Sequence, residues 1–111
     1  MDRFAALRSQ LTNCHALAQS SVLEEASLYL QVLALQQSFQ GQVLPLEATA
    51  DPALQTILTE INRSLRLLAV DVTFWRSSRQ PVTQKQRQQQ IGARLAQLGQ
   101  FLDMLSQQLE D

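Results

Sequence analysis

The sequence predicts an all-α protein in which residues 1–111 form a single domain, an antiparallel four-helix bundle. Apolar residues recur at steps of three and four along most of the chain, which is the helical period. Only three glycines and three prolines are present, too few for a turn-rich β-sandwich. The chain is 45% hydrophobic and 17% charged with a net charge of −1, a composition typical of a folded domain rather than a disordered tail.

The first two predicted helices span residues 2–19 and 21–44. A capping box, Ser21-Val22-Leu23-Glu24, predicts the start of the second helix, because each of its polar side chains satisfies a backbone N–H group there. Both helices carry an apolar stripe at helical spacing, formed by Phe4, Leu7, Leu11 and Cys14 on the first and by Leu28, Val32, Leu35, Phe39 and Val43 on the second.

A second apolar stripe runs along the second helix and consists of Leu23, Ala26, Leu30 and Leu33. A helix that is apolar on two sides is either central in its bundle or shared with a partner. We therefore expect a homodimer. The alternative to a four-helix bundle within one chain is a pair of long helices that pack across the dimer.

The third predicted helix follows a connection over Leu44–Ala50. Asp51 is placed as its N-cap, and Pro52 occupies the first helical position, where a missing N–H group costs nothing. Its apolar residues step by four and three over three heptads, namely Leu54, Leu58, Ile61, Leu65, Leu68, Val72 and Trp75.

The fourth predicted helix begins after Pro81, at a second capping box, Thr83-Gln84-Lys85-Gln86. Gly92 and Gly99 lie seven residues apart on one face of this helix, which favours a close approach to a neighbouring helix. The same four-and-three spacing predicts its buried residues: Ile91, Leu95, Leu98, Leu102, Leu105 and Leu109.

The residues that could carry catalysis are few, and we expect a protein that is not an enzyme. His15 and Cys14 are adjacent, so on a helix they point about 100° apart and cannot form a nucleophile–base pair. No metal-ligand spacing or glycine-rich phosphate loop occurs, so the sequence predicts no metal and no cofactor. A single cysteine, a start that lacks the pattern of a secretory signal, and the lack of a long apolar run predict a cytoplasmic protein without a membrane span.

Positive charge is concentrated in one part of the chain. Residues 9–62 contain no Lys or Arg, whereas residues 63–94 hold seven of the nine, with Asp71 as their one acidic residue. Three readings stay open for this basic segment: a solvated surface, a docking patch for an acidic protein, and a nucleic-acid contact. The last is disfavoured because the chain as a whole is slightly acidic.

Arg and Trp are preferred anchors in protein interfaces, so the candidate docking site centres on these residue types near the connection between the third and fourth helices. Asp71 has two readings: it forms an ion pair with Arg79 or with the fourth helix, or it contacts the partner. Lys85 and Arg87 are predicted in the first turn of a helix, where cations oppose the helix dipole. The candidate partner-binding residues are Arg66, Asp71, Trp75, Arg76, Arg79, Pro81 and Arg87.

Residues 60–83 resemble the cyanobacterial heterocyst frequency control protein family PatD. The matching motifs are Leu65-Arg66-Leu67-Leu68, Asp71-Val72, Phe74 and Ser78-Arg79-Gln80-Pro81-Val82-Thr83. Ser78 and Val82 stand where the family pattern has alanine. Over the rest of the chain the similarity is limited to length, helical pattern and a glutamine-rich fourth helix.

The resemblance implies a small helical protein that binds the tubulin-like division protein FtsZ and promotes the assembly of its filaments. In filamentous species it would thereby influence heterocyst frequency. Two alternatives remain at this point: a small regulator associated with nucleic acid, and a structural subunit of a larger helical assembly.

Overall fold

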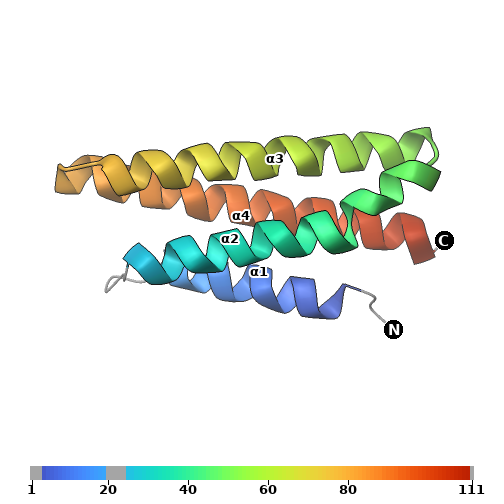
Figure 1. The fold of residues 1–111 in the computed structure, drawn as a ribbon, viewed down its shortest axis with the longest axis horizontal. Helices are drawn as coiled ribbons and strands as arrows, with labels where there is room; N and C mark the ends of the chain where they lie inside the picture. The colour runs from blue at the N-terminus through green and yellow to red at the C-terminus, as the bar shows by residue number, and fades with distance from the viewer. Residues whose placement is uncertain (1–3, 20–24, 111) are drawn as a thin grey trace.

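The computed structural model describes residues 4–19 and 25–110. Across these residues the chain is helical and contains no strand (Figure 1). Its elements are α1 (Ala5–Ala18), α2 (Glu25–Gln42), the short 3₁₀ helix η1 (Leu44–Thr49), α3 (Pro52–Ser77) and α4 (Pro81–Glu110). The predicted all-α four-helix bundle is therefore confirmed.

Each helix packs against the helices that precede and follow it, and α4 closes the ring by packing on α1. Neighbouring helices run in opposite directions (Figure 1), and two polar contacts show this for α1 and α4. Arg8 at the start of α1 forms an ion pair with Asp103 near the end of α4, and Gln88 near the start of α4 donates a hydrogen bond to the carbonyl oxygen of Ala18. The α3–α4 interface is the most extensive of the four.

The apolar stripes predicted from the sequence form the core. All five stripe residues from Leu28 to Val43 on α2 are at most 2% exposed, and the stripe residues from Ile91 to Leu105 on α4 are at most 1% exposed. The heptad residues of α3 are buried as well, including Trp75 at 2% exposure. Burial of these side chains, at about 25 cal/mol per Å² of apolar surface, is the main force that holds the four helices together.

The start of α3 has the predicted geometry. The backbone of Asp51 is extended (φ −74°, ψ 171°), and its Oδ1 accepts a hydrogen bond of 2.8 Å from the backbone N–H of Leu54. Pro52 is the first helical residue. This capping satisfies one of the N–H groups that every helix start leaves without an intrahelical partner.

The start of α4 differs from the prediction. The helix begins at Pro81, and the backbone N–H of Gln84 already bonds to the carbonyl oxygen of Gln80 at 2.9 Å. Thr83 therefore lies inside the helix, and the predicted Thr-x-x-Gln capping box is wrong. Proline at the first helical position makes the earlier start favourable. The predicted capping box at Ser21–Glu24 lies outside the described residues.

The two glycines of α4 have different surroundings. A Cβ atom added to Gly99 would lie 3.4 Å from the Cδ2 atom of Leu11, so α1 and α4 approach closely there, as predicted. A Cβ atom added to Gly92 would meet nothing within 4 Å. The prediction of close packing is therefore wrong for Gly92.

The bundle is elongated, with extents of 46 × 24 × 19 Å, because its long helices lie along one axis; the 30 residues of α4 alone span about 45 Å. The α3–α4 hairpin extends past the end of α1 and the start of α2 (Figure 1). Among the described residues, no helix combines the length and apolar character that a membrane crossing needs.

Candidate partner-binding surface

The tip of the α3–α4 hairpin is a short turn with a defined geometry. Ser78 leaves the helical conformation (φ −72°, ψ 128°), and its Oγ donates a hydrogen bond of 2.7 Å to the carbonyl oxygen of Phe74. The Oγ of Ser77 donates to the same oxygen at 3.2 Å. These bonds satisfy a carbonyl group at the end of α3, and the turn leaves Arg79 exposed at its apex.

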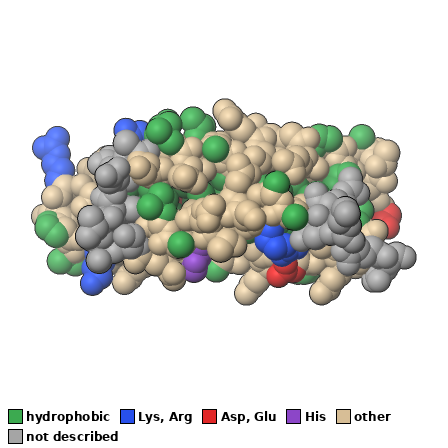
Figure 2. Space-filling view, turned by 90° about the horizontal axis from the view of Figure 1, so that it is seen from below, with side chains coloured by type: hydrophobic (Ala, Val, Ile, Leu, Met, Phe, Trp, Pro, Cys, Tyr) green, Lys and Arg blue, Asp and Glu red, His purple; other side chains and the backbone are tan. Residues whose placement is uncertain are grey.

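Four cationic side chains gather at this turn: Arg76 lies before it, Arg79 in it, and Lys85 and Arg87 after it. Between residues 72 and 102 the hairpin contains no Asp or Glu. Figure 2 shows Lys and Arg side chains gathered at one end of the molecule. The antiparallel hairpin thus brings two basic segments together, and their fields add at this tip.

Two of the four cations stack on aromatic rings, one on each side of α3. The guanidinium of Arg76 lies 4.2 Å from the ring centre of Tyr29 in α2, and that of Arg87 lies 5.0 Å from the ring centre of Phe74 in α3. Such a contact contributes about 0.5–1 kcal/mol at an exposed site and restricts the guanidinium to one place. Arg87 also donates to Gln90 Oε1 at 3.2 Å.

The predicted site residues do not all belong to this tip. Arg76, Arg79, Pro81 and Arg87 lie at the tip, whereas Arg66 is ten residues earlier on α3, about 15 Å away along the helix axis. Together with Lys85, the four residues at the tip form what we call the basic tip.

Trp75 is not a surface residue, so its predicted role as a docking anchor is not supported. It occupies a position of the buried heptad stripe, is 2% exposed, and packs with the core. The heptad spacing already indicated this burial. The Nε1 atom of Trp75 has no hydrogen-bond partner among the described residues.

Asp71 lies inside the α3–α4 interface. Its side chain is 12% exposed, and its Oδ2 accepts a hydrogen bond of 3.4 Å from Nε of Arg94. Arg94 also donates to Gln97 Oε1 at 3.1 Å. The structure therefore agrees with an ion pair to the fourth helix, and Asp71 has little surface left for a partner.

Lys85 and Arg87 lie further along α4 than the sequence predicts. Because the helix begins at Pro81, both residues lie in its second turn rather than in the first. The effect of the helix dipole falls off within the first turn, so these cations oppose it only weakly. Their positions therefore cost α4 little stability and give no separate indication of a functional role.

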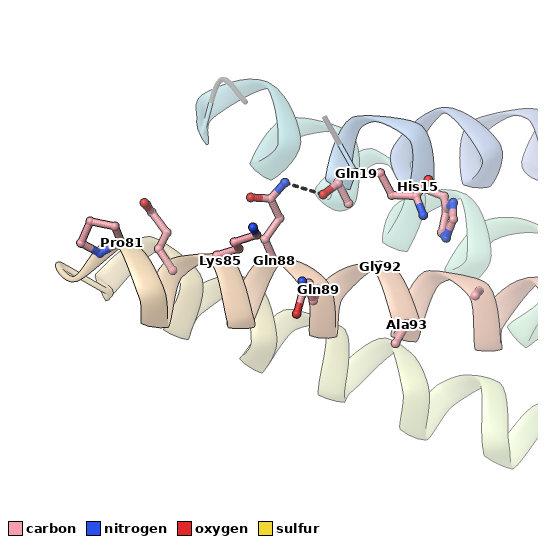
Figure 3. A pocket seen from close by; sticks show the side chains of 11 residues that line it. His15, Gln19, Pro81, Lys85, Gln88, Gln89, Gly92 and Ala93 are labelled. Carbon is pink, nitrogen blue, oxygen red and sulfur yellow. Dashed lines mark hydrogen bonds between the residues drawn. The ribbon is translucent and has the colours of Figure 1, made fainter. Parts of the chain in front are cut away.

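A groove of about 850 Å³ runs between the end of α1 and the first half of α4. Figure 3 shows His15 and Gln19 on one side, and Lys85, Gln88 and Gln89 on the other. The side chain of Gln88 crosses the groove, and its Nε2 donates a hydrogen bond of 2.5 Å to the carbonyl oxygen of Ala18. Gly92 and Ala93 form part of the lining, which explains why a Cβ atom at Gly92 would meet no neighbour.

The titratable groups near the groove do not form a reactive constellation. Cys14 is buried, and burial raises the pKa of its thiol from 9.0 to about 11 because the thiolate would lose its hydration. A thiol with such a pKa is a poor nucleophile at neutral pH. Within the described residues, no group of three or more His, Cys, Asp or Glu side chains is placed to hold a metal ion.

Sequence reasoning missed Tyr29 as a neighbour of the basic tip and Arg94 as the partner of Asp71. The arginine lies on the same face of α4 as the core leucines, so its spacing offered a signal. Tyr29 offered none, because its contact with Arg76 depends on the lateral register of α2 against α3.

Comparison of the chain with protein-family models, with curated proteins and with solved structures gave no significant match.

Proposed function

We propose that the protein is a non-enzymatic adaptor that binds the tubulin-like division protein FtsZ through its basic tip and promotes or bundles FtsZ filaments. The observation that carries this proposal is the gathering of Arg76, Arg79, Lys85 and Arg87 around one turn, on a hairpin that holds no acidic residue from 72 to 102. In filamentous cyanobacteria, such an adaptor would influence division and heterocyst frequency.

The chemistry of the basic tip suits an acidic protein partner. Arginine forms paired hydrogen bonds with carboxylates, and the stacked guanidinium of Arg87 is already held in place by Phe74. Phe74 itself is 49% exposed and offers an apolar contact beside the charge. A surface that combines arginine with an aromatic ring is typical of interface anchors.

The resemblance of residues 60–83 to the PatD family supplies the identity of the partner. That stretch covers the last 18 residues of α3, the turn and the first three residues of α4, and so includes Arg76, Arg79 and Pro81 of the basic tip but not Lys85 or Arg87. The partner therefore rests on the resemblance, and the tip as the docking surface rests on the geometry.

Linking two filaments requires at least two binding surfaces. A homodimer supplies them without further sequence, since each copy contributes one basic tip. We include the homodimer in the proposed function for this reason.

The test is co-sedimentation of the full chain with FtsZ and GTP, with light scattering as the measure of bundling. We expect co-pelleting and increased scattering for the wild type, and a several-fold loss of both for Arg79→Gln/Lys85→Gln. Both substituted residues are exposed, so the fold should not change. A matched control, Gln100→Glu/Gln107→Glu, produces the same net charge away from the tip and should behave as the wild type.

Equal co-pelleting of the tip variant and the wild type would overturn the assignment of the tip. If the wild type instead bound duplex DNA, with an affinity that falls steeply with salt, and did not pellet with FtsZ, the nucleic-acid alternative would replace the proposal.

A further inference from the structure

One face of α2 is apolar and exposed to solvent. Leu30 is 60% exposed, Leu33 39% and Tyr29 37%, although the opposite face of the same helix is fully buried. Leu30 and Leu33 belong to the second apolar stripe of this helix. An exposed leucine is ordinary by itself, but three large apolar side chains within five residues of one helix form a contiguous patch.

The residues of this face carry no charge of their own, and the guanidinium of Arg76 in α3 lies at its edge, 4.2 Å from the ring centre of Tyr29. From residue 26 to residue 46 the sequence contains no Asp, Glu, Lys or Arg. The exposed side chains that surround the three apolar residues are Gln31, Ala34 and Gln37. We call Tyr29, Leu30, Leu33, Ala34 and Gln37 the α2 face. It borders the basic tip where Arg76 stacks on Tyr29, but Leu30, Leu33, Ala34 and Gln37 offer no cation to an acidic partner.

The absence of charge favours a second copy of the chain as the occupant. In a two-fold dimer every residue meets the same surface it belongs to, so a charged face would bring like charges together. The α2 face meets no such penalty. If two α2 helices pair antiparallel, Leu30 lies on the partner's Leu33 and Tyr29 on the partner's Ala34, and the two helix dipoles oppose each other favourably.

The size of the α2 face sets the strength of this association. The nine residues from Tyr29 to Gln37 span about 13 Å of a helix about 10–12 Å wide, so each copy offers about 150 Å². Stable complexes bury about 800 Å² on each partner. The pair is therefore expected to be weak and to form only as the protein concentration rises.

We infer that the α2 face is a self-association surface, on which a second copy of this chain docks through Leu30 and Leu33. The link between this dimer and filament bundling rests on the proposed function, but the self-association itself does not depend on FtsZ.

Sedimentation velocity of the full chain tests the inference over protein concentrations from about 5 to 500 μM, a range suited to a weak dimer. We expect the wild type to change from monomer to dimer across this range. Leu30→Gln/Leu33→Gln should stay monomeric, with a dissociation constant raised about a hundredfold or more, because four leucines leave the interface of the pair. Circular dichroism and thermal unfolding verify that this variant keeps its fold.

The matched control is Val70→Gln/Met104→Gln. Each of these residues is 47% exposed, and they lie on α3 and α4, outside the α2 face. This variant should dimerise as the wild type does. A wild type that stays monomeric throughout, or an α2 variant that dimerises equally well, overturns the inference.

Thiol cross-linking gives an independent measurement. Cys14 is buried, so a cysteine introduced at Leu30 is the accessible thiol of the chain. A short bis-maleimide should join Leu30→Cys into covalent dimers, because the two introduced thiols lie about one helical turn apart across the pair, whereas Val82→Cys, at a site 71% exposed, should not cross-link. Equal cross-linking at both sites contradicts the inference. Failure of FtsZ binding with intact self-association would remove only the proposed function.

Discussion

Asp71 and Trp75 each place a polar group in the buried part of α3, and the two groups differ in whether they have a hydrogen-bond partner. The carboxylate of Asp71 is bound by Arg94, whereas Nε1 of Trp75 has no hydrogen-bond partner among the described residues. An ion pair that is partly shielded from water contributes more than one on the surface, because solvent screens it less. A second pair, between Glu60 and Arg63 on the surface of α3, allows a direct comparison.

We expect a double-mutant cycle of Asp71→Ala and Arg94→Ala to give a coupling free energy of about 1–2 kcal/mol in chemical unfolding experiments. The Glu60–Arg63 pair, whose closest atoms are 3.8 Å apart and whose side chains are 42% and 66% exposed, should give about 0.5 kcal/mol or less. Equal coupling in the two cycles would show that Arg94 does not hold Asp71 in solution.

The buried thiol of Cys14 predicts a pH dependence of stability. Its pKa is higher in the folded protein, at about 11, than the usual 9.0. The folded state therefore holds the proton more firmly, and the resulting stabilisation is complete below pH 9 and is lost as the pH rises toward 11. The stability difference between the wild type and Cys14→Ala should shrink by about 1 kcal/mol from pH 8 to pH 10, measured by urea unfolding. A constant difference would contradict the burial.

At the scale of single helices, the apolar periodicity predicts which residues are buried, but not which residues of neighbouring helices are in contact. The stripes of α3 and α4 were predictable because their apolar residues keep a strict four-and-three spacing that only one helix face can satisfy. The α2 stripe from Leu28 to Val43 was identified as well, but the sequence alone could not tell it from the stripe that includes Leu30 and Leu33. Which of two apolar faces turns inward depends on the other three helices.

At the candidate site, the clustering of charge is visible in the sequence, whereas contacts between helices that are distant in the sequence are not. The arginines of the basic tip were found because charge clusters along the chain, and a hairpin keeps such residues close. The contact of Tyr29 with Arg76 was not predictable, since they are 47 residues apart and their helices share no motif that fixes a register. Trp75 meets the criteria for both a core residue and an interface anchor, and its heptad position is the signal that agrees with its burial.

The surroundings of the α4 glycines predict that alanine stabilises the protein by different amounts at the two positions. Gly92→Ala adds a methyl group in open space and removes the flexibility of glycine from a helix interior, so the free energy of unfolding should rise by about 0.5–1 kcal/mol. Gly99→Ala should gain less, because its new methyl group meets Leu11 at 3.4 Å. Thermal unfolding of both variants gives the comparison, and a larger gain at Gly99 would contradict the close approach of α1 and α4 described above.

At the scale of the whole molecule, the elongated shape gives side-by-side and end-to-end dimers different radii of gyration. The single chain has a Cα radius of gyration of 14.5 Å and is 46 Å long. Two copies that pack side by side through α2 should have a radius of gyration of about 18–19 Å, whereas two copies joined end to end would reach about 27 Å. Small-angle X-ray scattering at concentrations where the dimer predominates separates the two, and the larger value would exclude α2 as the interface.

The α3–α4 hairpin that reaches past the other two helices also has a consequence for local unfolding. Among the described residues, fewer side chains surround the backbone hydrogen bonds of the tip than those near Leu65, so the tip can open without disrupting the four-helix body. Amide protons near Ser77 and Lys85 should then exchange with solvent faster than those near Leu65, where the full bundle surrounds α3. A partner that grips the tip would slow this local exchange while leaving the global unfolding of the bundle unchanged, so its footprint could be mapped amide by amide.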